Sequence, residues 1–268
     1  MTFPSLRNTV LLLNLFNGLV RAANVNISGS AVTTRFWDCC KPSCGWEDKA
    51  PVTRPVQTCK ADGFSEIDLK AGTGCREGGT GYLCTNQHPW AINDTLSYGF
   101  AGVFLAGYNL ETHWCCACYQ LDFLSDPLKG KSMIVQASNT AFDVKTSDRF
   151  SLAIPGGNQT ADDGCNKQYS LDQTVFGQRG SGVGSKSDCD KLPQDLRDSC
   201  KWRFDWFKDA AYPEVKYKRV ACPKEITDKT QCIRNDEKVL LGQSLAPTLP
   251  APSMAAVLAI AIAGLLSV

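Results

Sequence analysis

The sequence predicts a mainly β domain whose long loops are held by disulfides. Six segments alternate polar and apolar residues as half-buried strands do. The stretches between them are rich in Gly, Asp, Asn and Cys, and the chain has 14 cysteines but two histidines. The formal net charge of +1 gives no reason to expect nucleic acid or an acidic polymer as a partner.

The strongest strand pattern is the last one, where Val215 and Tyr217 alternate with lysines. The predicted strands cover residues 31–37, 100–105, 116–123, 132–137, 150–154 and 214–220. One short helix is predicted from about Leu192 to Phe207, because apolar residues recur there at three- and four-residue intervals. No internal repeat is visible.

The N-terminal segment is typical of a signal peptide. Arg7 precedes an apolar run over residues 9–20, and small residues follow at 22–23. A membrane anchor is the less favoured reading, because Asn14 and Asn17 interrupt a run already short for a span. We therefore expect residues 1–22 to be removed and the chain to be secreted.

Secretion favours disulfides over metal binding by the cysteines. The two histidines, His88 and His113, argue against mixed Cys/His zinc sites, and a Cys-only zinc site stays open at this point. We expect no metal and no cofactor. Asn26, Asn93 and Asn158 begin N-x-S/T sequons that a secreted chain could glycosylate.

The C-terminal segment has the order of a GPI attachment signal. Residues 254–268 form an apolar tail too short for a bilayer, and residues 237–253 form a spacer with an attachment site near Gly242. Asn235 is the less favoured site, and a short true span is the less favoured reading of the tail. Residues 23–236 then form one domain, expected to be a monomer at the cell surface or wall, in contact with the membrane through the lipid alone.

The run from Thr33 to Trp46 contains the strongest chemical signal. Asp38 stands between the aromatic pair Phe36–Trp37 and three cysteines, so it is a candidate general base in a sugar-binding groove. The alternative is a structural carboxylate that pairs with Arg35 or caps a turn. Inverting hydrolysis would also require an acid about 6.5–9.5 Å from the base.

With these residues the chain resembles the glycoside hydrolase family 45 endoglucanases, from about Thr33 to Asn235. The opening run matches the family signature, with Phe36 in place of the usual Tyr, and the cysteines follow the family's order. Further matches cover residues 90–94, 114–119, 155–157, 163–165 and 202–208.

The resemblance implies a six-stranded double-psi β-barrel with a long open groove. It also implies endo-acting, inverting cleavage of β-1,4-glucan, with Asp38 as general base and Phe36 and Trp46 as sugar contacts. The implied disulfides are Cys39–Cys165, Cys40–Cys75, Cys44–Cys115, Cys59–Cys84, Cys116–Cys232, Cys118–Cys222 and Cys189–Cys200.

The chain departs from the family at the acid. Family members carry an Asn-His-Phe-Asp motif shortly before Pro-Gly-Gly, and Ser151 stands at the position of its Asp. A serine hydroxyl is a very poor general acid. Asp143 matches an auxiliary carboxylate of the family and is the preferred substitute acid. Asp148 is the second candidate, and a solvated loop carboxylate is the favoured interpretation of it.

Two functions are compatible with a chain that keeps the candidate base but has a serine at the position of the family's acid. The first is a cellulase-like endo-β-1,4-glucanase, with reduced activity, acting on cellulose, β-glucan or xyloglucan. The alternative is a non-hydrolytic protein that binds β-glucan or loosens walls, as expansins do. The tryptophans at 202 and 206 are expected in the core, while those at 37, 90 and 114 could serve either the core or the sugar.

Overall fold

The computed structural model describes residues 26–108, 110–143, 146–159 and 163–245. The predicted signal peptide, the apolar tail and the spacer after residue 245 lie outside the described residues. No helix in the described part of the chain has the length and apolar character needed to cross a bilayer.

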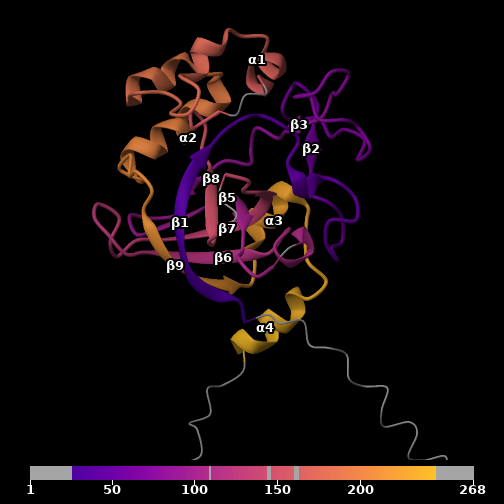
Figure 1. The fold of residues 1–268 in the computed structure, drawn as a ribbon, viewed down its shortest axis with the longest axis vertical. Coiled ribbons are helices and arrows are strands. Elements are labelled where there is room, and N and C mark those ends of the chain that lie inside the picture. Colours follow the sequence, from indigo (N-terminus) through magenta and orange to yellow (C-terminus); the bar gives the residue numbers. More distant parts are fainter. Residues whose placement is uncertain (1–25, 109, 144–145, 160–162, 246–268) are drawn as a thin grey trace, which may run out of the picture.

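Six strands close into a barrel (Figure 1). β1 pairs with β8 and β9, β5 pairs with β7 and β8, and β6 joins β7 to β9. Each strand therefore has two neighbours and none of the six is left as an open edge. The strands are β1 (Ser28–Phe36), β5 (Leu96–Phe104), β6 (Cys118–Phe123), β7 (Ser132–Thr140), β8 (Arg149–Ala153) and β9 (Glu214–Val220).

These strands are the six that alternation predicts, so the mainly β class and the six-stranded barrel are confirmed. Three aromatic residues fill the interior: Tyr119 and Phe150 are fully buried, and both contact Tyr217 with ring centroids 5.0–6.0 Å apart. Since neighbouring residues of a strand point to opposite faces, Phe150 and Leu152 of β8 face the core, and Arg149 and Ser151 face outward.

Short elements surround the barrel, with α1 and α2 toward one end and α4 at the other (Figure 1). The predicted helix is α2, which begins after Pro193 and buries Leu196 and Trp202. The α-helices of the described residues are α1 (Gly164–Tyr169), α2 (Gln194–Asp205), α3 (Lys224–Thr230) and α4 (Glu237–Leu245), and the short strands are β2 (Thr58–Cys59), β3 (Tyr82–Leu83) and β4 (Trp90–Ala91). Short 3-10 helices cover Ser43–Gly45, Glu111–His113, Gln173–Phe176 and Lys186–Lys191.

Helices α1, α3 and α4 were not predicted. With six and seven residues, α1 and α3 are too short to show a helical period. The start of the expected spacer is instead folded as α4, where Glu237 and Leu240 are buried and the Glu237 carboxylate accepts the N–H of Cys222. The folded domain therefore extends past the expected boundary at residue 236.

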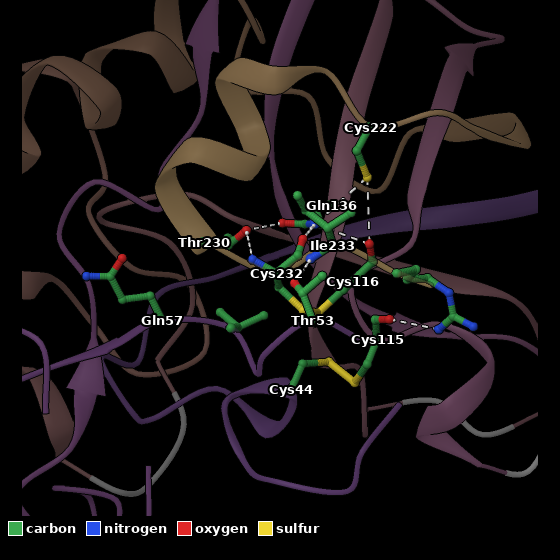
Figure 2. Close-up of a disulfide and its surroundings, with 12 residues drawn as sticks. Cys44, Thr53, Gln57, Cys115, Cys116, Gln136, Cys222, Thr230, Cys232 and Ile233 are labelled. Carbon is green, nitrogen blue, oxygen red and sulfur yellow. Dashed lines mark hydrogen bonds between the residues drawn. A yellow bond between two sulfur atoms is a disulfide. The ribbon is translucent and has the colours of Figure 1, made fainter. Parts of the chain in front are cut away.

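All 14 cysteines are paired. The seven bridges are the pairs implied by the family resemblance, and they connect residues 11 to 126 positions apart. A bridged cysteine cannot act as a thiolate ligand, so the Cys-only zinc site left open above is excluded. Figure 2 shows Gln136 beside two bridges, where its Nε2 donates to the carbonyls of Cys116 and Cys232.

Candidate active-site groove

A groove of about 620 Å³ crosses the outer face of the barrel. It lies beside the end of β1, the end of β7 and the outward face of β8. The predicted site residues that line it are Phe36, Asp38, Trp46, Asp143, Ser151 and Asn158. The fold thus brings together side chains that are more than 100 positions apart.

Asp38 is held in a rigid turn that follows β1. The next two residues form the bridges Cys39–Cys165 and Cys40–Cys75, and Cys39 has a φ of 61°. Gly164 lets α1 approach this turn, since a Cβ at that position would lie 2.3 Å from the Asp38 carbonyl oxygen. The covalent links fix the backbone of the candidate base.

The structure addresses the two structural roles considered for Asp38, a turn cap and an ion pair with Arg35. Asp38 Oδ1 accepts the N–H of Cys40 at 3.1 Å, as in an Asx turn. Arg35 Nη1 lies 2.8 Å from Asp209 Oδ1 and donates to it. Asp38 thus caps a turn while it also lines the groove, and these two roles are compatible.

Ser151 lies on the outward face of β8, between two other strands of the barrel. It is opposite Thr34 of β1 and Gly102 of β5, and all three residues line the groove. Its side chain is largely buried. A side chain at this position faces the groove, and no residue of β8 carries a carboxyl group.

Asp143 supplies a carboxylate near that position. It follows β7, its side chain is 48% exposed, and its Oδ2 lies 3.7 Å from Arg149 Nε. Arg149 shares the outward face of β8 with Ser151. Asp143 is therefore a groove carboxylate on the Ser151 flank.

Asp148 is placed differently from a substitute acid. It is absent from the groove lining, its Oδ1 accepts the N–H of Ala106 at 2.7 Å, and its Oδ2 accepts the hydroxyl of Tyr217 at 2.6 Å. These contacts favour a structural role for Asp148 over the role of a substitute acid. The two hydrogen bonds also distinguish Asp148 from the solvated loop carboxylate that the sequence analysis favoured. Burial, and next the hydrogen bond to Asp148, raise the pKa of Tyr217.

The groove contains aromatic surfaces at several points. Besides Phe36 and Trp46, it is lined by Phe142 and Tyr212, whose relative exposures are 65% and 67%. Sequence reasoning missed both, although Phe142 directly precedes Asp143. The exposed ring of Tyr212 beside the groove can contact the apolar face of a sugar.

The remaining tryptophans belong mainly to the core. The indoles at 37, 114, 202 and 206 are buried, and Trp90 is partly buried against Tyr98 and Phe100. The sequon residues Asn26, Asn93 and Asn158 are all exposed. Asn158 lines the groove, and its main-chain oxygen accepts the N–H of Trp37 at 2.8 Å.

The family model for glycosyl hydrolase family 45 matches residues 30–233. The chain belongs to this family. An endoglucanase of Cryptopygus antarcticus is 45% identical over 216 residues, which cover 81% of this chain and 94% of that protein. An endoglucanase of Phaedon cochleariae is 36% identical over 209 residues, covering 77% of this chain and 85% of that protein.

A solved structure agrees with this assignment. The crystal structure of a cellulase from the Antarctic springtail Cryptopygus antarcticus has a TM-score of 0.74 and 45% sequence identity, and the match covers 78% of this chain and 99% of the springtail chain. Membership of family 45 makes the chain a glycosidase, and the groove with Asp38 is its candidate active site.

Proposed function

We propose that this family 45 protein is an endo-β-1,4-glucanase that inverts the anomeric centre, with Asp38 as general base and Asp143 as substitute acid. The observation that carries the proposal is the groove itself, which contains Asp38, Asp143 and exposed aromatic rings together. The names of the relatives support a β-glucan substrate.

The proposed reaction is a single displacement. Asp38 takes a proton from a water as the water oxygen attacks the anomeric carbon. The bond from that carbon to the leaving oxygen breaks, and Asp143 gives its proton to that oxygen. Exchange with solvent then restores both carboxyl groups. Because Asp143 substitutes for an acid on β8, we expect turnover below that of relatives with a carboxylic acid there.

A second function is favoured by one specific observation, the hydroxyl of Ser151 on the groove face of β8, where the family resemblance implies an acid. A groove that keeps its base and aromatic rings but lacks a competent acid would bind β-glucan without cutting it. Such a protein could loosen a wall by competing for chain contacts.

Location is a further part of the proposal. The seven bridges support an oxidising compartment, since disulfides persist mainly in secreted and surface proteins. With the signal-like and GPI-like segments, this supports a glycosylated monomer secreted to the cell surface and held by a lipid near Gly242. Release of the full-length protein from intact cells by a phosphatidylinositol-specific phospholipase tests the anchor, and retention after treatment contradicts it.

The function is tested by release of reducing ends from carboxymethylcellulose, barley β-glucan and xyloglucan, with Asp38→Asn as the control. The enzyme reading predicts activity that the variant lacks, and proton NMR of the first product should show the inverted anomer. If wild type and variant are equally inert while both bind β-glucan, the non-hydrolytic function is correct instead.

A further inference from the structure

Trp46 is shared by two cavities. It lines the groove, and it also lines an adjoining cavity of about 230 Å³ formed mainly by residues 44–55. A second hollow therefore adjoins the groove at this indole. Asp143 and Ser151 line the groove alone, so the second cavity is not part of the catalytic region.

One face of the Trp46 ring is already occupied. The ammonium of Lys41 lies 3.8 Å from the ring centroid, within the range of a cation–π contact. The same ammonium donates to the main-chain oxygens of Leu69 and Ala71 at 2.6 and 2.9 Å, and its burial lowers the pKa of Lys41. Since Lys41 is anchored on that side, a sugar must stack on the opposite face or along the edge of the indole.

The adjoining cavity has a rigid floor. The Cys44–Cys115 disulfide (Figure 2), Thr53 and Pro55 line it. Thr53 is itself fixed to the C-terminal segment, because its N–H donates to the carbonyl of Ile233 at 2.8 Å. A preformed hollow of this kind costs little ordering when a ligand enters.

The rim of the cavity is polar. Glu47, Asp48 and Thr53 are exposed there, and Arg54 is held by an ion pair to Glu66. Carboxylate, hydroxyl and guanidinium groups together can accept from and donate to the ring hydroxyls of a sugar. The cavity is smaller than the roughly 300–1,000 Å³ of pockets for drug-sized ligands, which suits a single sugar ring.

We propose that this cavity is an additional glucosyl-binding subsite, which holds a remote sugar of the same chain whose scissile bond lies beside Asp38. The inference rests on the proposed β-glucan substrate. Binding energy gained far from the reacting bond favours long chains over short ones. The subsite would therefore give this protein a preference for polymers and long oligosaccharides.

The test measures binding, so that it does not depend on turnover. Full-length Asp38→Asn protein is titrated calorimetrically with β-1,4-gluco-oligosaccharides of increasing length, alone and with Glu47→Ala/Asp48→Gly added. Glycine suits position 48, whose φ is 62°. A matched control carries Glu77→Ala/Glu225→Ala, which removes two exposed acids outside both cavities.

We expect affinity to rise again, by about tenfold, at the chain length that first reaches the cavity. The Glu47/Asp48 variant should lose this last increment, and the control should keep it. An equal loss at every length, or no increment beyond the groove in any protein, overturns the subsite while the proposed function stands. If no oligosaccharide of any length binds, the proposed β-glucan function itself fails.

Discussion

The two flanks of the groove are built in different ways. On one flank, Asp38 lies in a turn fixed by two disulfides and by its own hydrogen bond to Cys40. On the other flank, Ser151 is one side chain of a regular strand, and Asp143 is a half-exposed residue after β7 with an arginine 3.7 Å away.

The difference shows why the side chain at position 151 can change without loss of the fold. The backbone of β8 pairs with β1 and β5 through main-chain groups, which do not depend on the side chain at position 151. The turn of Asp38, by contrast, depends on the neighbouring cysteines and on the close approach of Gly164. A change of side chain at position 151 is therefore expected to destabilise the fold less than a change in the turn of Asp38.

The largest expected effect is on the rigid flank. Asp38→Asn should lower the rate of reducing-end release by about 10²–10⁴-fold, because the amide cannot take a proton from water. Its oxygen can still accept from the N–H of Cys40, so the thermal unfolding temperature should stay close to that of wild type. Activity within twofold of wild type would mean that Asp38 is not the base.

The β8 flank should respond in the opposite direction. Ser151→Asp should raise the rate by about 100-fold, because it returns a carboxylic acid to a largely buried site where the protonated form is favoured. Ser151→Asn is the matched control, since it has the same shape and no acid. Equal rates in the two variants would show that the missing acid is not what limits turnover.

Most of the barrel could be predicted because each strand has one face in the core. In residues 214–220, buried and exposed side chains alternate, as the sequence pattern predicts, and the other five segments were predicted in the same way. Helices α1 and α3 could not be predicted in this way, since each covers at most two turns. Helix α4 was missed because its placement depends on tertiary contacts, such as that of Glu237 with the N–H of Cys222.

The site was predictable to a different extent on its two flanks. Phe36, Asp38 and Trp46 stand within one short run, so sequence alone could group them. The exposure of Phe142 and Tyr212 beside the groove depends on how distant loops meet, which a single sequence does not report. The hydrogen bonds of Asp148 to Ala106 and Tyr217 are equally non-local, and they favour a structural role for this carboxylate.

Asp143 and Asp148 offer a matched pair of acids for separating catalysis from structure. Asp143→Asn should lower turnover by about tenfold or more, since it removes a carboxyl group that lines the groove on the Ser151 flank. Asp148→Asn should leave turnover near wild type and lower the free energy of unfolding by about 1 kcal/mol, because it weakens two hydrogen bonds. If instead Asp148→Asn lowered turnover and Asp143→Asn lowered stability, the roles assigned to these two carboxylates would be wrong.

The smallest expected effect on turnover is that of His88, which lies outside the groove. At acid pH, both protonation of a groove carboxylate and unfolding of the whole domain would lower the measured turnover. Burial lowers the pKa of His88 to about 4, and Ser199 Oγ lies 2.6 Å from its Nδ1. The folded protein therefore keeps His88 neutral while the unfolded chain protonates it below about pH 6.5. This contribution to stability is complete above that pH and is lost, by about 2–3 kcal/mol, as the pH falls toward 4.

Urea unfolding of wild type and His88→Asn across this range tests the assignment. The variant should be less sensitive to pH between 6.5 and 4, whereas His113→Asn, at the exposed second histidine, should follow wild type. Turnover at pH 7 should be the same in all three proteins. If His88→Asn loses stability in acid as steeply as wild type, another group controls the acid limit. If turnover of His88→Asn still falls at low pH while the variant stays folded, that fall comes from protonation of groove carboxyl groups. The pH dependence of turnover can then be measured for both flanks without interference from unfolding.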